Sequence, residues 1–283
     1  MAFKLKTDPK GSTRQLGRRG ALKQSTFIRL EKNPSLIGVE SAMEVMLLSA
    51  LDLSNEVTEI LYQPFTIDVA NDRLFKTHEE LAAHRSSLRQ AGMTGVFYTP
   101  DIQVTRWFGS ARVSEVIEAK DSDWLPTEDD QYRQKLSTAQ LLLEPHGIGF
   151  DLYEASNRAL YKSPLAWNIG KLHSLKMLRR DVLDTLSDDY NEYLNRRDDM
   201  LHELDSGPKT VRGLASTFGI HPASVWHLLI DELASTDLRA QGLGPASVIS
   251  SNQIAGVPAL NFYSVLQTLK VNKAIWLLEA THA

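Results

Sequence analysis

The chain has 283 residues, of which 42% are hydrophobic and 23% charged, and it contains no cysteine. This length and composition predict a soluble globular protein with one large domain or two modest ones. The absence of cysteine excludes disulfides, zinc–thiolate sites and iron–sulfur clusters. We expect a cytoplasmic protein, because no apolar run is long enough for a signal peptide or a transmembrane helix.

The charge is unevenly distributed along the chain. The net charge is −4, but residues 1–32 hold nine Lys or Arg and two Asp or Glu, so the remaining residues carry −11. We interpret residues 1–34 as a basic, extended arm that contacts DNA phosphates, the kind of contact that makes DNA affinity depend on salt. The residues assigned to this contact are Lys10, Arg14, Arg18, Arg19, Lys23 and Arg29.

The first half of the chain alternates helical and strand patterns. Ser41 begins a helix, and Glu44 lies three residues later, as in a capping box. A second capping box, Thr77 with Glu80, begins a polar helix that ends at Gly92. The predicted order is a helix from residue 41, a strand over 57–69 bent near Gln63-Pro64, a helix over 77–92, strands over 96–104 and 113–119, a helix over 127–143 and a strand over 150–153.

From about residue 156 the pattern becomes mainly helical. Mixed charges over 176–205 predict a solvated pair of helices. The apolar spacing over 210–234 predicts two helices joined at Gly219, a helix-turn-helix signature, and the Gly-rich residues 242–249 fit a wing. A closing helix is expected over 271–280.

The residues with the clearest chemistry lie in the first half, on two neighbouring strands. Glu118 and Lys120 are two residues apart in a strand, so they share a face, and hairpin pairing brings Asp101 near them. Two carboxylates and an ammonium are suited to a hard divalent cation that also binds phosphate. The cation acidifies a water and polarises the phosphoryl group, and Lys120 orients that water.

Pro100-Asp101, a hairpin and then Glu118-Ala119-Lys120 resemble the PD-(D/E)xK nuclease superfamily. Together with Glu40–Glu44 and Tyr62-Gln63-Pro64, they resemble the TnsA family, the endonuclease subunits of heteromeric DNA transposases. The resemblance covers about residues 25–155 and implies an α/β fold with a restriction-endonuclease-like αβββαβ core. The domains it implies are an arm over 1–34, a nuclease domain over 35–156 and an all-helical, winged-helix-like domain over 157–283, with the helix-turn-helix at about 208–255.

The resemblance also implies a function and a set of site residues. The chain would cut one DNA strand at each transposon end while a TnsB-like transposase cuts and joins the other. A TnsC-like AAA+ ATPase would bind the C-terminal domain. The catalytic residues implied are Glu44, Asp101, Glu118 and Lys120. One or two Mg²⁺ ions, replaceable by Mn²⁺, would be held by Asp101, Glu118, the Ala119 carbonyl and Glu44.

Some of these assignments have alternatives. Many members of the family have Gln at the position of Glu118. Glu44 is also the capping residue of Ser41, and Glu40 at the helix entrance is the second choice for its role. Gln63 is assigned a place beside the site. Lys135 on the following helix is interpreted as an exposed lysine.

The second helix of the helix-turn-helix lacks the side chains that usually read bases. Over 221–233 it offers Ser224, Trp226 and His227 but no Lys or Arg, and it ends in Asp231-Glu232. Base-reading helices usually carry Arg, Lys, Asn or Gln. We therefore expect this domain to bind protein rather than to read DNA sequence.

Two other functions fit the sequence less well. One is a stand-alone restriction or repair nuclease of the same superfamily, which would cut without partners. The other is a non-catalytic winged-helix DNA-binding regulator. Residues 206–283 hold five Lys or Arg against four Asp or Glu, which disfavours the regulator.

Overall fold

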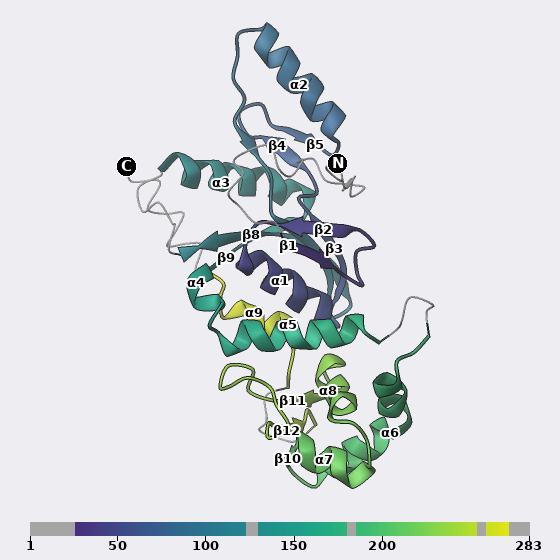
Figure 1. Cartoon of the computed structure of the whole chain (residues 1–283). Coiled ribbons are helices and arrows are strands. Elements are labelled where there is room, and N and C mark those ends of the chain that lie inside the picture. The colour runs from purple at the N-terminus through teal and green to yellow at the C-terminus, as the bar shows by residue number, and fades with distance from the viewer. Residues whose placement is uncertain (1–25, 123–129, 180–184, 254–258, 272–283) are drawn as a thin grey trace, which may run out of the picture. The chain divides into compact units, whose positions relative to one another are not determined.

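The computed structural model describes residues 26–122, 130–179, 185–253 and 259–271 (Figure 1). The protein is a mixed α/β structure that divides into two compact units. The first unit comprises Met1–Val45, Glu56–Asn157 and Leu269–Ala283, and the second comprises Met46–Asn55 and Arg158–Thr268. Helix α1 (Ala42–Leu53) therefore starts in the first unit and ends in the second.

A four-stranded sheet is the centre of the first unit. Its order is β3-β7-β8-β9, formed by β3 (Val57–Tyr62), β7 (Ile102–Phe108), β8 (Ala111–Asp121) and β9 (Ile148–Ala155). The first three strands pair antiparallel, whereas β8 and β9 are parallel. The parallel pair requires a crossover, which α3 (Asp130–Leu143) and the 3₁₀ turn η2 (Glu144–His146) provide.

Helix α3 packs against this sheet through one apolar stripe. Leu136, Ala139 and Leu143 are fully buried and share a cluster with Val116 of β8 and Phe150 of β9. The helix predicted over 127–143 is thus confirmed from Asp130 to Leu143. Its predicted first residues, 127–129, lie outside the described part of the chain. The cluster fixes α3 beside the strand that carries Glu118 and Lys120.

Two predicted strands are each divided in two. The pattern over 57–69 forms β3 and β4 (Thr66–Asp68) in different sheets, because Gln63 has a left-handed φ of 47°. The pattern over 96–104 forms β6 (Phe97–Tyr98) and the start of β7, separated at Pro100, which has no N–H for the ladder. Strands β4, β5 (Arg73–Phe75) and β6 form a small sheet. Helix α2 (His78–Gln90) follows β5 in the chain.

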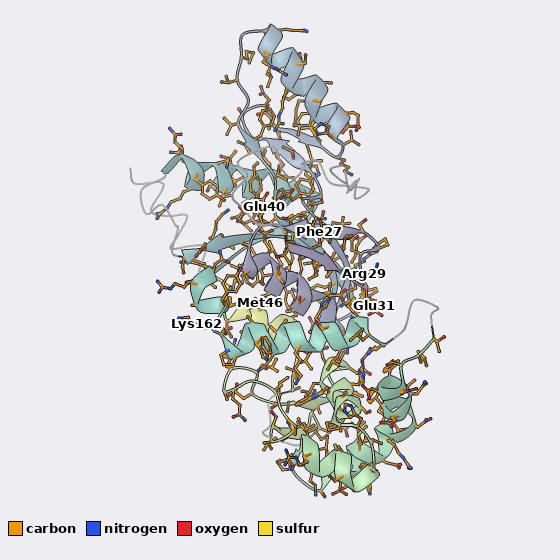
Figure 2. The ribbon with its side chains drawn as sticks, viewed as in Figure 1. Phe27, Arg29, Glu31, Glu40, Met46 and Lys162 are labelled. Atoms are coloured by element: carbon orange, nitrogen blue, oxygen red, sulfur yellow. The ribbon has the colours of Figure 1, made fainter. Side chains whose placement is uncertain are left out.

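The end of the predicted arm is a strand. Strand β1 (Thr26–Arg29) pairs antiparallel with β2 (Leu36–Val39), because the apolar side chain of Ile28 is buried. The expectation of an extended arm up to residue 34 is therefore wrong for this segment. Arg29 is exposed on β1 (Figure 2). The other arm residues lie outside the described residues, namely Lys10, Arg14, Arg18, Arg19 and Lys23.

The second unit is built around a buried central helix. Helix α8 (Pro222–Ile230) packs against α5 (Pro164–Met177), α6 (Asp188–Asp205) and α7 (Val211–Phe218). The predicted junction of α7 and α8 at Gly219 is confirmed, with φ 64°. The remaining elements are the short helices α4 (Asn157–Leu160), which begins with the last residue of the first unit, and α9 (Phe262–Gln267), and the strands β10 (Lys209–Thr210), β11 (Ala234–Ser235) and β12 (Val248–Ser251).

Three predictions for this half of the chain need correction or fall outside the structure. The half is not all-helical, because β10, β12 and β11 form a three-stranded antiparallel sheet. In the described part of 176–205 there is one full helix, α6, rather than a pair, and it is solvated except for a face that buries Tyr193, Met200 and Leu204. The closing helix over 271–280 falls almost wholly on residues that the structure does not describe, and α9 was not predicted. Among the described residues, no helix has the length and apolar character needed to cross a membrane.

Candidate active site

The β7–β8 hairpin brings Asp101 and Glu118 together. Ile102 pairs with Ile117 across the hairpin. Asp101 precedes Ile102 and Glu118 follows Ile117, so these two acidic residues are neighbours at the open end of the hairpin. The Ala119 backbone N–H donates a hydrogen bond of 2.9 Å to Oδ2 of Asp101. Asp101 remains partly exposed, whereas Glu118 is 3% exposed. The site thus combines a buried carboxylate with one that solvent reaches.

Glu118 accepts contacts from three elements. The Tyr98 hydroxyl of β6 donates to Oε2 at 2.9 Å, and the Tyr132 hydroxyl of α3 donates to Oε1 at 2.6 Å. Lys120 Nζ lies 2.6 Å from the same Oε1, as expected for residues that share a strand face. These contacts fix the carboxylate, and such supporting bonds typically orient a ligand in a functional site.

The charges of the site are unbalanced. Partial burial raises the pKa of Asp101 well above its usual value, and the neighbouring carboxylates of Glu118 and Glu44 raise it further against the opposing effect of Lys120. Burial opposes the charge on Lys120, but Glu118, Asp101 and Glu44 outweigh it and raise the pKa of its ammonium group. Lys120 therefore stays positively charged. Carboxylates held this close to one another are characteristic of functional sites.

Glu44 is buried at the N-terminus of α1 and has two roles at once. Its Oε1 accepts from the Ser41 hydroxyl at 2.8 Å, while Ser41 Oγ accepts from the Glu44 N–H at 3.1 Å, so the capping box is present. Its Oε2 accepts from the Tyr62 hydroxyl at 2.6 Å, and its charge acts on Asp101. The Glu40 backbone N–H also donates to Glu44 Oε2, at 3.3 Å, and the Glu40 carboxylate acts on the neighbouring Tyr62 hydroxyl.

Gln63 lies directly beside these groups in a strained conformation. Its backbone N–H donates to the Asp101 carbonyl at 2.8 Å, and its Nε2 contacts the Tyr62 hydroxyl at 3.5 Å. Its φ of 47° is uncommon for a residue with a side chain and costs on the order of 1 kcal/mol. Its Oε1 is buried and has no hydrogen-bond partner within the described structure. A buried carbonyl oxygen in this state is a candidate cation ligand.

Three tyrosines of the site were not predicted from sequence to act there. Tyr62, Tyr98 and Tyr132 each donate to a site carboxylate. Burial and the nearby carboxylates raise the pKa of Tyr62 and of Tyr98, so both phenols stay neutral and remain donors. Tyr62 and Tyr98 belong to the Tyr-Gln-Pro and Tyr-Thr-Pro-Asp runs, which is a usable signal. Nothing in the local sequence marks Tyr132.

Asn157 links the two segments that carry the site. Its Nδ2 donates to Asp121 Oδ2 at 2.7 Å, at the end of the strand that holds Glu118 and Lys120. Its Oδ1 accepts from the Met43 N–H at 3.0 Å, in the first turn of the helix that holds Glu44. This bridge satisfies a free N–H at the helix start and sets the distance between strand and helix.

Lys135 is closer to the site than its sequence position indicates. Its Nζ lies 4.7 Å from the centre of the Tyr132 ring, and Lys120 Nζ lies 4.9 Å from the same centre. By contrast, the three polar or aromatic side chains that the second predicted helix of the helix-turn-helix offers are not accessible. Ser224, Trp226 and His227 are 0%, 4% and 2% exposed in α8.

Among the described residues, no group of three or more His, Asp or Glu side chains is gathered closely enough to hold a metal ion alone. The sequence was compared with models of known protein families and with curated proteins, and it matches none of them. Function therefore has to be inferred from the residues and their geometry.

Proposed function

We propose that the protein is a metal-dependent DNA endonuclease that cuts one strand at the ends of a transposon and acts with a partner transposase. The observation that carries the proposal is the meeting of Asp101, Glu118 and Lys120 at the end of one hairpin, with Glu44 acting on Asp101 from a helix. The elements α1, β3, β7, β8, α3 and β9 follow one another in this order, with β4, β5, α2 and β6 inserted between β3 and β7, and this order supports assignment of a restriction-endonuclease-like αβββαβ core.

The donor set fits a Mg²⁺ or Mn²⁺ ion. Mg²⁺ is usually bound by one or two carboxylates together with water and substrate phosphate, so a cluster of three acidic ligands is not required. Asp101 and Glu118 would supply the carboxylates, the Ala119 carbonyl and Gln63 Oε1 the neutral oxygens, and Glu44 a contact to a bound water or a second ion. The raised pKa of Asp101 supports this assignment, because a bound cation would offset both the burial and the carboxylate repulsion that raise it.

Each residue of the proposed site would have a separate role in the reaction. The bound cation would supply an acidified water and polarise the scissile phosphate. Lys120 keeps its proton and places a positive charge where negative charge develops on the phosphoryl oxygens, and it orients the attacking water. Tyr98 and Tyr132 hold Glu118 in one orientation, and Tyr62 does the same for Glu44.

We assign the second unit to protein docking. Its α7–α8 pair and three-stranded sheet support a winged helix-turn-helix, but the buried side chains of α8 leave that helix unsuited to reading bases. The partners proposed are a TnsB-like transposase and, through this unit, a TnsC-like AAA+ ATPase. Double-stranded DNA at the transposon ends would be the substrate.

Strand cleavage by the full chain tests the proposal. The substrate is duplex DNA with the terminal sequence of the element that encodes the chain, incubated with Mg²⁺ and with or without the partner transposase. Asp101→Asn and Lys120→Ala are expected to lower cleavage about 10²- to 10³-fold, the loss typical of removing a group that stabilises the transition state. Lys162→Ala, which removes an exposed lysine, is the control (Figure 2).

Two results would change the assignment. Full cleavage by Asp101→Asn would remove the site from the mechanism. Efficient cleavage by the wild-type chain without the transposase would favour the stand-alone nuclease.

A further inference from the structure

The ribbon formed by β1 and β2 has one buried and one exposed face. Among the described strands, these two pair only with each other. Ile28 of β1 is buried, and successive side chains of a strand point to opposite faces, so its neighbours Phe27 and Arg29 share the other face (Figure 2). Leu36 lies opposite Arg29 on β2 and belongs to the same face. Phe27 is 46% exposed and Leu36 41%, so this outer face presents two large apolar side chains and one cation to solvent.

The charge of the outer face and of the sequence around it favours an anionic ligand. Within the described part of the chain, no residue forms an ion pair or a side-chain hydrogen bond with Arg29. The turn between the two strands holds Glu31 and Lys32, whose formal charges cancel. Residues 1–32 hold nine Lys or Arg against two Asp or Glu, a net charge of +7, whereas the rest of the chain carries −11. An anionic macromolecule is therefore attracted to this part of the chain and repelled by most of the remainder.

The ribbon leads directly into the candidate site. Strand β2 ends at Val39, and the next residue, Glu40, donates its backbone N–H to Glu44 Oε2 at 3.3 Å. Phe27 pairs with Gly38, two residues before Glu40, so the Cα atoms of Phe27 and Glu40 lie within about 13 Å of each other. Because consecutive nucleotides rise about 3.4 Å, a duplex that places its scissile phosphate at the site has at most about five base pairs between the cut and Phe27.

The outer face carries the side chains that DNA-binding ribbons use. A two-stranded ribbon fits into the major groove of DNA, and strands of other proteins bind either groove. Apolar side chains such as Phe and Leu pack against or between base steps, and Arg binds phosphate oxygens. Duplex DNA is also the anion that the proposed function brings to the neighbouring carboxylates. It is therefore the occupant that fits both the charge and the position of this face.

We propose that the outer face of the β1–β2 ribbon binds the DNA substrate beside the cut. Arg29 holds a backbone phosphate, while Phe27 and Leu36 pack against the sugars and bases of the adjoining groove. This inference rests on the proposed nuclease function and adds a DNA-binding surface to it. It also changes the role expected for Arg29, which binds from a fixed ribbon with apolar neighbours rather than from an extended arm.

Salt-dependent DNA binding by the full chain tests the phosphate contact without any cleavage step. Binding of a fluorescently labelled duplex is measured by anisotropy over a range of KCl concentrations, with Ca²⁺ in place of Mg²⁺. Loss of one phosphate contact lowers the slope of log K against log[salt] by about 0.9. Arg29→Gln is expected to lower the slope by that amount. Lys162→Gln removes an exposed lysine of the second unit and should keep the wild-type slope.

The apolar contact has a different signature in the same assay. Phe27→Ser should weaken binding about five- to tenfold at every salt concentration and leave the slope unchanged, because an apolar contact releases no counterions. Phe108→Ser is the matched control. It removes a phenyl ring that is 68% exposed at the other end of the β7–β8 hairpin from the site, and it should change neither quantity.

Photocrosslinking locates the contact directly. With p-benzoylphenylalanine in place of Phe27, irradiation should attach the chain to the duplex within about five base pairs of the cut. The same replacement of Phe108 should give no such product. An unchanged slope in Arg29→Gln, or the absence of a crosslink from position 27, would overturn the proposal. So would variants that bind DNA like the wild type and lose only transposase-dependent cleavage, since the ribbon would then bind the partner protein.

The failure of the ribbon surface and the failure of the nuclease function give different results. If Arg29→Gln keeps the wild-type slope while Asp101→Asn loses cleavage, the nuclease stands and the ribbon surface is wrong. If the slope and the crosslink change as expected while Asp101→Asn cleaves like the wild type, the ribbon binds DNA and the nuclease site is wrong.

Discussion

Asp52 in the second unit and Asp101 in the first are aspartates with opposite surroundings. Asp52 is fully buried and its Oδ2 faces two basic side chains, His173 at 3.2 Å and Lys176 at 3.8 Å. Burial raises the pKa of Asp101, and the neighbouring carboxylates of Glu118 and Glu44 raise it further. A buried acidic residue that stabilises the fold lies beside positively charged groups. An acidic residue held beside other acidic residues destabilises the fold, and such an arrangement is typical of a ligand-binding or catalytic site.

The largest expected effect is on stability, and it differs between the two aspartates. Asp52→Asn removes the buried negative charge that His173 and Lys176 face, so it should lower the free energy of unfolding by roughly 3 kcal/mol. Asp101→Asn removes a repelled charge and can still accept the Ala119 N–H, so stability should be unchanged or higher. Thermal and urea unfolding of the two variants measure this. Equal destabilisation by both would remove the contrast between the units.

In the second unit, the titration of His227 should make the stability of the fold depend on pH. Burial and the charge of Arg179 lower the pKa of His227 to about 4, from an ordinary value near 6.5. A histidine with a lowered pKa in the folded state contributes stability that is present above about pH 6.5 and is lost as the pH falls to about 4. The loss over that window should be on the order of 3 kcal/mol.

The control for this prediction is His227→Gln. Carboxylates also take up protons in this range, so the quantity to compare is the difference between the variant and the wild type in urea unfolding at successive pH values. The difference in free energy of unfolding between the wild type and His227→Gln should become smaller as the pH falls from 6.5 to 4. A constant gap would show that His227 does not titrate there.

A smaller effect is expected from the tyrosines that support the candidate site. Tyr98→Phe removes the donor to Glu118 Oε2 and should weaken Mn²⁺ binding by about 10- to 100-fold, as is typical for a partner of a metal ligand. Tyr193→Phe is the matched control, because its hydroxyl donates to Asp231 in the second unit. That variant should change stability but leave Mn²⁺ affinity unaltered, as titration calorimetry can measure.

The sequence was sufficient to predict the parts of the site that follow from local pattern. Strand alternation places Glu118 and Lys120 on one face, and hairpin pairing brings Asp101 beside them. The capping box located Glu44 and the start of its helix. These relations depend on neighbours a few residues away or on one hairpin, so they can be inferred without the tertiary structure.

The supporting residues depend on contacts that no local pattern encodes. Tyr132 reaches Glu118 only because α3 packs on the sheet in one register, and Asn157 is 114 residues from the Met43 N–H that it accepts. The left-handed conformation of Gln63 contradicts the usual preference of a residue before proline, so the prediction of one strand over 57–69, bent near Gln63-Pro64, was wrong: the chain forms two strands in different sheets.

Cation binding by the full-length chain tests the central claim most directly, because it requires neither partner nor DNA. Mn²⁺ titration followed by calorimetry should give saturable binding in the wild type and in Glu59→Gln, which changes an exposed acid on β3. Asp101→Asn and Glu118→Gln should weaken that binding at least about tenfold, as expected when a carboxylate ligand is lost. Equal Mn²⁺ affinity in all four proteins, or no saturable binding in the wild type, would contradict the proposed site.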